Sequence, residues 1–215
     1  MNTEEDINAF IENTKGKVLV AGYGSLLSQY SRLTYSQIAG NSIEVFVNGW
    51  ERNWITRSVT EQQTYAGAIP VSDSALSAQL IALQFNQDFA TREQDYRFTP
   101  INASCLEIVS PVAKHHHELQ SHLANTPIYI CETLAVMHSS ANFPVSLSYI
   151  ETCLIGCYEL SGLQGVKDFF THTRGWATTH FVDDRKQHLY PRSTTVEDAP
   201  WDLLALLDNA SVTRF

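Results

Sequence analysis

The segment from Val18 to Leu27 constrains the fold of this chain more than any other. An apolar run with β-type composition ends on Gly22, and Gly24 follows before a serine and two leucines. Glycine directly after a strand lets the backbone turn tightly and bring its N–H groups close to a ligand, because no Cβ blocks the approach. The pattern predicts a buried strand that opens into a main-chain cradle for an anion or an oxyanion.

Three common glycine loops do not fit this segment. A dinucleotide fingerprint needs a third glycine where Leu27 stands, and alternating β and α units afterwards, although Glu44 does fall about 20 residues on, where an acid is expected. A P-loop needs a Gly-Lys-Ser/Thr sequence, which does not follow. A nucleophile elbow needs glycines two residues before and two after Ser25. A tight turn that holds no ligand stays open as the alternative.

Charge, the N-terminus and the apolar windows narrow the class of protein. The 215 residues suffice for one large domain with a substantial core. The net charge is −9 and no run of Lys or Arg occurs, so we expect no nucleic-acid partner and no membrane partner. The N-terminus lacks a secretory signal pattern, and no apolar window reaches the roughly 18 residues of a membrane span. We therefore expect a cytoplasmic protein, and its oligomeric state stays open.

The four cysteines show no C-x-x-C spacing, so we expect reduced thiols and no disulfide framework. They are Cys105, Cys131, Cys153 and Cys157. Cys153 and Cys157 lie one helical turn apart among apolar residues. This pattern favours buried core cysteines over a Cys-His nucleophile.

A histidine-rich segment lies between His115 and His122. A zinc-protease helix needs two histidines four residues apart, whereas His117 and His122 are five apart. His115, Glu118 and His122 share one helical face, which leaves an adventitious metal site open. We expect a solvated polar helix face instead.

Strand patterns dominate up to Ile108, and helical patterns dominate beyond Pro111. We expect strands over Val18–Gly22, Ile43–Trp50, Trp54–Ser58, Tyr65–Val71, Leu80–Phe85 and Phe98–Ile108. We expect helices from a Thr3 cap to near Lys15, and over Asp88–Tyr96, Ala113–Asn125, Ser146–Gly156, Leu163–Thr171 and Asp202–Leu207, with a loop or short helix over Gln29–Ile38. The sequence thus predicts a core over residues 1–112 and a mainly helical extension over 113–215, packed together as one structural domain.

Three segments, in order along the chain, resemble the γ-glutamylcyclotransferase-like superfamily. Tyr23-Gly24-Ser25-Leu26 is similar to its YGSL motif, and Val47–Trp54 is similar to its apolar-x-Gly-aromatic-x-Arg segment. Arg92–Arg97 resembles its glutamate motif, in which an acid lies a few residues before a tyrosine and a basic residue. The resemblance covers residues 18 to about 108.

Further segments of the C-terminal half lie outside the common core of that superfamily. They resemble marks of a bacterial subgroup with an extension. They are Gly175-Trp176, Asp183-Asp184-Arg185 and Tyr190-Pro191-Arg192.

The resemblance implies an α+β fold of the γ-glutamylcyclotransferase-like type, with a mixed, strongly bent sheet or partial β-barrel and surrounding helices. It also implies an enzyme that acts on a small γ-glutamyl substrate. In such a reaction the substrate's own α-amine attacks its γ-carbonyl and releases 5-oxoproline, so neither a cofactor nor a metal is needed. The alternative is a non-catalytic small-molecule-binding or interaction module on the same fold.

The resemblance also carries over individual residues. Glu93 matches the catalytic acid and is expected to act first as general base and then as general acid. Main-chain donors are expected from Tyr23, Gly24, Ser25 and Leu26, and Ser25 is expected to matter for its backbone and not for its hydroxyl. Tyr96 is expected to line the pocket. Arg52 is expected to bind an acidic substrate, although it and Arg97 are also suited to pairing with surface carboxylates.

Two alternatives for the catalytic acid stay open. Relatives often place a residue between the tyrosine and the arginine, whereas Tyr96 and Arg97 are adjacent here. A slip of one position would make Asp95 the acid. Because Glu93 lies among Asp88, Arg92, Asp95 and Arg97, the segment also fits a solvated, charged helix face.

Overall fold

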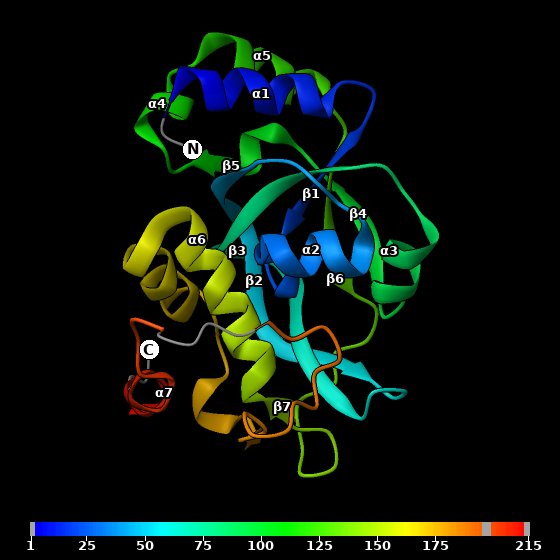
Figure 1. The fold of residues 1–215 in the computed structure, drawn as a ribbon, viewed down its shortest axis with the longest axis vertical. Coiled ribbons are helices and arrows are strands. Elements are labelled where there is room, and N and C mark those ends of the chain that lie inside the picture. The colour runs from blue at the N-terminus through cyan, green and yellow to red at the C-terminus, as the bar shows by residue number, and fades with distance from the viewer. Residues whose placement is uncertain (1–2, 195–198, 213–215) are drawn as a thin grey trace.

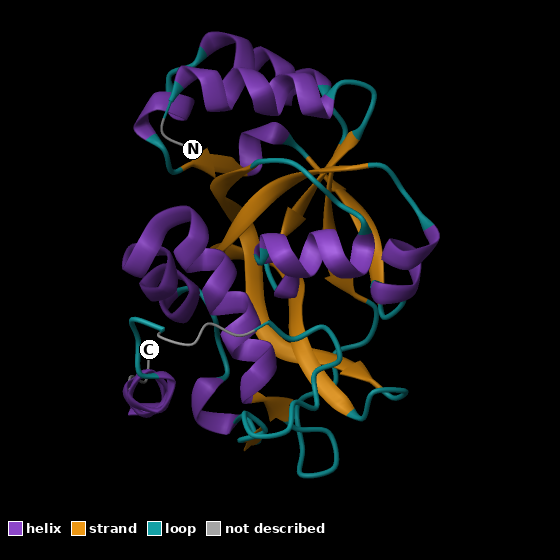
Figure 2. Ribbon diagram, in the orientation of Figure 1, coloured by secondary structure: helices purple, strands orange, loops and turns teal. Residues whose placement is uncertain are grey.

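The computed structural model, which describes residues 3–194 and 199–212, is built around one six-stranded mixed sheet (Figures 1 and 2). Its strands are β1 (Val18–Gly22), β2 (Ser42–Ser58), β3 (Gln63–Leu83), β4 (Tyr96–Ile101), β5 (Leu106–Ile108) and β6 (Ile128–Thr133). The helices are α1 (Glu4–Thr14), α2 (Gln29–Ser36), α3 (Gln87–Arg92), α4 (Pro111–Lys114), α5 (His117–Asn125), α6 (Leu147–Thr171) and α7 (Leu203–Val212). Short elements are the 3-10 helices η1 (Ser25–Leu27), η2 (Ala103–Cys105) and η3 (Trp176–Thr178), and the strand pair β7 (Val145–Ser146) and β8 (Phe181–Val182). The predicted α+β class is therefore confirmed.

The predicted strand Val18–Gly22 is β1, and it lies inside the sheet. The strand order is β4-β6-β1-β3-β2-β5, with β1 antiparallel to β3 and parallel to β6. Leu19, Val20 and Ala21 are almost completely buried, which agrees with the near-continuous apolar run of a strand covered on both faces. The end of this strand is therefore held firmly between two neighbours.

The sheet bends sharply where β1 ends. Beyond Gly22, β3 and β6 approach each other and pair directly at Ala68 and Glu132. A Cβ on Gly67 would lie 2.0 Å from Thr133 Oγ1 and 2.3 Å from a second threonine oxygen, so only glycine allows this approach. The sheet is strongly bent but does not close into a barrel through the described residues, because β4 and β5 are its edges.

Two long strands replace four predicted short ones. β2 and β3 form one antiparallel hairpin, with register shifts between Asn48 and Trp50 and between Trp54 and Thr56. The polar stretch after Val71 is part of β3, and β3 pairs with β2 on both sides of it, up to Pro70 and again from Ala75. The predicted strand over Phe98–Ile108 is likewise divided between β4, η2 and β5. The predicted helix over Asp88–Tyr96 ends early: α3 stops at Arg92 and Tyr96 opens β4.

The second half of the chain contributes to the sheet, which corrects the expected boundary at residue 112. β6 lies between β4 and β1, so residues 1–112 do not contain the whole sheet. The helical prediction over Ala113–Asn125 is divided into α4 and α5, and two predicted helices are merged in α6 across the non-helical Gly162. The two halves share one hydrophobic core.

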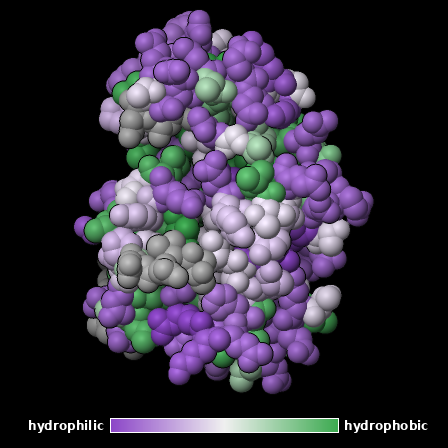
Figure 3. All heavy atoms as spheres, in the orientation of Figure 1, coloured by the Kyte–Doolittle hydropathy of each residue, from purple (hydrophilic) through white to green (hydrophobic). Residues whose placement is uncertain are grey.

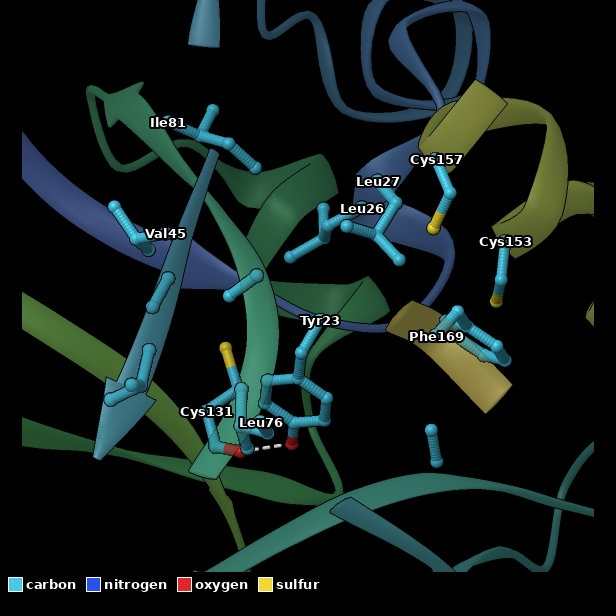
Figure 4. Packing of buried hydrophobic residues seen from close by; sticks show 14 of the residues in the cluster. Tyr23, Leu26, Leu27, Val45, Leu76, Ile81, Cys131, Cys153, Cys157 and Phe169 are labelled. Atoms are coloured by element: carbon cyan, nitrogen blue, oxygen red, sulfur yellow. Dashed lines mark hydrogen bonds between the residues drawn. The ribbon is translucent and has the colours of Figure 1, made fainter. Parts of the chain in front are cut away.

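The helices cover the sheet from several sides. Thr3 caps α1 in a capping box with Asp6, as the N-terminal pattern predicts, and α1 packs with α4 and α5 at one end of the molecule (Figure 1). α6 packs against η1 directly after β1, and Figure 4 shows Leu27 near Cys157 of that helix. The surface in Figure 3 is mainly hydrophilic, with hydrophobic residues in separate patches. No helix among the described residues is long and apolar enough to cross a membrane.

Candidate active site

The backbone after β1 is held by two buried arginines. Arg52 donates a hydrogen bond of 3.0 Å from Nη1 to the Tyr23 carbonyl. Arg32 donates from Nη1 to the carbonyls of Leu26 and Leu27, at 2.7 and 2.8 Å. The N–H and C=O groups of a trans peptide point in opposite directions. Because the Tyr23 carbonyl faces Arg52, the N–H of the same peptide, which belongs to Gly24, points away from Arg52.

Gly24 allows a tyrosine hydroxyl to approach the main chain. A Cβ at this position would lie 2.6 Å from the Tyr149 hydroxyl, which itself accepts a hydrogen bond of 3.2 Å from the Ala66 N–H. Any side chain larger than hydrogen would displace the Tyr149 hydroxyl from the loop. Close packing against Tyr149 thus explains why a glycine stands at position 24.

A small pocket lies against this loop. Its volume is about 40 Å³, room for about three water molecules. Its walls combine the loop with four further tyrosines, two arginines and one carboxylate. The lining residues are Ala21, Gly22, Tyr23, Gly24, Ser25, Leu26, Tyr65, Ala66, Arg92, Glu93, Tyr96, Cys131, Tyr149, Tyr190 and Arg192.

Glu93 is the carboxylate of this pocket. It follows the last residue of α3, where its N–H donates to the Phe89 carbonyl at 3.0 Å, and only 8% of the residue is exposed. Arg92 Nε lies 3.3 Å from Glu93 Oε1, and the Cys131 thiol donates a hydrogen bond to the carboxylate. Burial raises the pKa of Glu93 above its ordinary value, although Arg92 and Arg192 act in the opposite direction. A carboxylate in this environment can exchange a proton nearer to neutral pH than an exposed glutamate can.

The Ser25 hydroxyl lies in a buried polar network. It accepts hydrogen bonds from Arg92 Nη2 at 2.9 Å and from the Tyr190 hydroxyl at 2.6 Å. Its own hydrogen has no acceptor among the described residues. Ser25 therefore contributes its hydroxyl as well as its backbone to the pocket wall, whereas the sequence indicated the backbone alone.

Tyr23 and Tyr96 line the pocket, and both hydroxyls are bound to main-chain carbonyls. Tyr23 donates to the Cys131 carbonyl, as the dashed line in Figure 4 shows, and Tyr96 donates to the Ala66 carbonyl at 2.7 Å. These bonds fasten the loop and the start of β4 to β6 and β3. The two rings thereby form fixed walls.

The segment 183–194 adds one side of the pocket. Asp184 is buried and accepts hydrogen bonds from the Ser148 N–H at 2.8 Å and from the Leu189 N–H at 2.7 Å, which ties the segment to the start of α6. Tyr190 is 2% exposed and reaches Ser25 from this segment. Of the three C-terminal segments that the sequence indicates, one, Tyr190-Pro191-Arg192, therefore lies at the pocket.

Arg192 lies at the edge of the pocket and is paired with Glu61. Two of its nitrogens donate to the Glu61 carboxylate at 2.8 and 2.9 Å, and its Nε donates to the Tyr190 hydroxyl at 3.3 Å. Tyr65 also donates to Glu61. The arrangement holds a positive charge at the pocket edge in a fixed orientation.

Three charged residues of the sequence analysis lie away from the pocket. Arg52 is fully buried, and its Nε and both Nη atoms donate to protein oxygens, so it supports the loop and does not reach a substrate. This is a correction of its expected substrate-binding role. Arg97 is largely exposed and pairs with Glu132, the alternative that the sequence left open. Asp95, the second candidate acid, is not among the lining residues.

The cysteines are free, and Cys131, Cys153 and Cys157 are buried, as predicted for the last two. Burial raises the pKa of the Cys153 thiol to about 12, which makes it a poor nucleophile. His122 bonds to Thr14 of α1. No group of three histidine, cysteine or acidic residues in the described part of the chain is close enough to hold a metal ion.

Sequence reasoning missed most of the polar pocket wall. Arg92 lies in a charged segment that also fits a solvated helix face, and no role in the pocket is predicted for it. Tyr65 and Tyr149 carry no motif that marks them. Tyr190 and Arg192 belong to a segment that the sequence marked, but nothing in the sequence brings that segment to the loop.

Comparisons with solved structures show which type of fold this chain has. No family model and no curated protein sequence matches the chain. A solved structure described as a γ-glutamyl cyclotransferase aligns over 80% of this chain and 98% of its own, with 10% identity and a TM-score of 0.50. YkqA from Bacillus subtilis matches over 79% of this chain with 11% identity and a TM-score of 0.48, and this match spans 60% of the length of YkqA. A γ-glutamyl cyclotransferase specific to glutathione from yeast matches over 73% of this chain and 97% of its own, with 12% identity and a TM-score of 0.45. The chain has the mixed α+β fold of the γ-glutamyl cyclotransferase-like type.

Proposed function

We propose that this protein is a γ-glutamyl cyclotransferase, an enzyme that cleaves a γ-glutamyl amide and releases 5-oxoproline. The observation that carries the proposal is the position of Glu93, whose buried carboxylate lines the same small pocket as the loop Tyr23–Leu26. The fold likeness to a γ-glutamyl cyclotransferase supports it.

Glu93 acts first as a base in this reaction. The α-amine of the substrate is mostly protonated near neutral pH and attacks only after it loses a proton. The carboxylate of Glu93 takes that proton, and the amine nitrogen then forms a bond to the γ-carbonyl carbon. The raised pKa of Glu93 suits this transfer, because proton exchange is most effective when the pKa lies near the working pH.

The same residue completes the reaction as an acid. When the bond between the γ-carbon and the leaving nitrogen breaks, protonated Glu93 returns a proton to that nitrogen. The attacking nitrogen gives its second proton to solvent, so the products are 5-oxoproline with one N–H and the free amine or amino acid. No group of the protein forms a covalent bond to the substrate, and Glu93 ends in its starting state.

The loop after β1 stabilises the charge that forms on the carbonyl oxygen. The Leu27 N–H donates to the Gly24 carbonyl, and the Ser28 N–H donates to the Ser25 carbonyl. The N–H groups of Ser25 and Leu26 have no carbonyl partner among the described residues. The Ser25 hydroxyl adds a third donor. Loss of one such donor typically costs about 3 kcal/mol of transition-state stabilisation.

The polar groups of the pocket support the reacting part of a glutamyl group as its occupant. A volume of about 40 Å³ suits a few heavy atoms and not a whole tripeptide, so the leaving amine must extend toward the pocket edge. Arg92 and Arg192 are the cationic groups of the pocket lining that can bind the α-carboxylate of the glutamyl group, beside the carboxylates of Glu93 and Glu61 that they already face. Segment 183–194 then decides which amine is accepted.

The test is incubation of the protein with glutathione, γ-glutamyl dipeptides and γ-glutamylamines, followed by mass-spectrometric detection of 5-oxoproline. We expect release from at least one class, with the matching free amine in equal amount. If none of these substrates gives 5-oxoproline above the no-enzyme rate, the cyclotransferase is excluded and the non-catalytic binding module takes its place.

A further inference from the structure

A second pocket lies beside Leu27, at the end of the same loop. Its volume is about 180 Å³, and helices α1, α2 and α6, which Figure 1 shows around one face of the molecule, all contribute to it. Its lining residues are Asp6, Leu27, Gln29, Arg32, Gly40, Asn41, Ser42, Gln79, Gly156, Glu159 and Leu160. We call it the Arg32 pocket. It shares only Leu27 with η1, and Glu93 is not among its lining residues.

Arg32 is buried in this pocket with part of its guanidinium unpaired. Only 2% of the residue is exposed, and its Nη1 donates to the carbonyls of Leu26 and Leu27 and to Gln79 Oε1. Its Nε and Nη2 have no hydrogen-bond partner among the described residues, and no described carboxylate lies within 4.0 Å. Arg52 differs, because all three of its nitrogens make hydrogen bonds.

A buried arginine with no carboxylate in ion-pair contact favours an anion beside it. The charge of Glu159 acts on Arg32 only from beyond that distance. Removal of a charge from water is costly unless an opposite charge or several hydrogen bonds replace the water. Burial lowers the pKa of Arg32 only to about 10, so the group stays charged at neutral pH. A carboxylate has two oxygens that match the free Nε and Nη2 of the fork.

The rim of the pocket carries the opposite charge. Asp6 and Glu159 both line it, and Glu159 is held in place because its Oε2 accepts the Gln29 N–H at 3.2 Å. A simple anion would be repelled by two carboxylates on its way to Arg32. A molecule with a carboxylate at one end and an ammonium group at the other would be favoured at both places.

We propose that the Arg32 pocket binds a small zwitterion, an α-amino acid. Its carboxylate binds Nε and Nη2 of Arg32, and its ammonium group faces Glu159. This inference goes beyond the cyclotransferase activity and does not depend on it. Since Arg32 also holds the carbonyls of η1, the bound amino acid contacts the group that fixes the loop of the other pocket.

The test uses the full chain and the twenty common α-amino acids, screened by thermal unfolding and then by calorimetry for the tightest one. We expect that one amino acid binds, and that its methyl ester and its analogue without the amino group each bind at least about tenfold more weakly. Glu93→Gln should bind the amino acid as the natural protein does, which separates this pocket from the proposed active site.

Three variants locate the site. Leu160→Trp fills the pocket and should abolish binding, whereas Leu163→Trp, an exposed position on the same helix and outside the lining, should leave it unchanged. Glu159→Gln should weaken the binding of the amino acid about fivefold to tenfold and strengthen the binding of the analogue that lacks the amino group. Arg32→Gln should abolish binding; where this variant does not fold, the other variants decide.

The proposal is overturned if none of the twenty amino acids binds the folded protein. It is also overturned if binding survives Leu160→Trp, or is lost in Glu93→Gln, because the amino acid would then lie in the other pocket. An equal effect of Glu159→Gln on the amino acid and on its deaminated analogue would contradict the predicted orientation.

Discussion

The pocket around Glu93 and the Arg32 pocket adjoin the same loop, and their charges are reversed. The first encloses a buried carboxylate with Arg92 and Arg192 beside it. The second encloses a buried guanidinium with carboxylates of Asp6 and Glu159 at its rim. A buried carboxylate can change its protonation state near neutral pH, whereas a guanidinium stays charged. Only the first pocket therefore suits proton transfer, and the second suits binding.

The difference follows from the backbone between the two pockets. A loop that turns N–H groups to one side turns carbonyls to the other. Those carbonyls are buried and need donors, which Arg32 and Arg52 supply. The arginine pocket is thus a consequence of the support that the loop requires.

Glu93→Gln gives the largest expected effect and tests the first pocket directly. The amide keeps the size of the side chain but cannot accept the substrate's proton, so we expect the rate of 5-oxoproline release to fall about 100-fold to 10,000-fold. Circular dichroism should show an unchanged fold. Initial rates at saturating substrate measure the effect.

Asp95→Asn is the matched control for that variant. Asp95 is two residues away and outside the pocket lining, so its amide should retain nearly full activity. Activity that persists in Glu93→Gln and disappears in Asp95→Asn would show that the side chain chosen as base is the wrong one.

The sequence predicts the parts of this site that depend on local patterns. The apolar run before Gly22 indicates a buried strand, and Thr3 indicates a capped helix; both are confirmed. The motif resemblance singles out Glu93, which the structure brings to the same pocket as the loop. These features depend on neighbours in the sequence and are therefore visible in it.

The remaining parts depend on contacts between distant segments. β6 is a six-residue strand that its short pattern does not separate from the helical surroundings, and its place is set by pairing with β1 and β4. Tyr190 reaches Ser25 across 165 positions of the chain. Arg52 has the charge expected of a ligand-binding residue, and only its five hydrogen bonds to protein atoms identify it as a loop support.

Arg52→Met and Arg32→Met compare the two arginines that support the loop. Arg52 donates from all three nitrogens, so its loss leaves more buried oxygens without a donor. We expect Arg52→Met to lower the free energy of unfolding by about 3 kcal/mol, and Arg32→Met by about 1 to 2 kcal/mol. Urea denaturation measures both. The reverse order would contradict the assignment of Arg52 as the main support.

Tyr190→Phe tests whether segment 183–194 belongs to the Glu93 pocket. The change removes the hydrogen bond of 2.6 Å to Ser25 and should lower the free energy of unfolding by about 1 kcal/mol, with a fall in activity of about fivefold. Tyr158→Phe, an exposed tyrosine of α6, is the control and should change neither. Full activity in Tyr190→Phe would show that segment 183–194 does not contribute to the active site.

The pH dependence of stability gives the smallest effect and separates the two pockets by the chemistry of their charges. The pKa of Glu93 is raised in the folded state above its ordinary 4.5, because burial favours the protonated form over the ionised form. Its favourable contribution is therefore complete below the unfolded pKa and is lost as pH rises through the folded pKa. The free energy of unfolding of the natural protein should fall relative to that of Glu93→Gln over this interval, with a slope no steeper than about 1.4 kcal/mol per pH unit.

The same measurement on Arg32→Gln should give a constant difference from the natural protein up to about pH 8, because Arg32 has a pKa of about 10 and does not titrate there. A difference for Glu93→Gln that stays constant from pH 4 to 8 would mean that the pKa of Glu93 is the same in the folded and unfolded states, and would remove the physical basis for its role as a base.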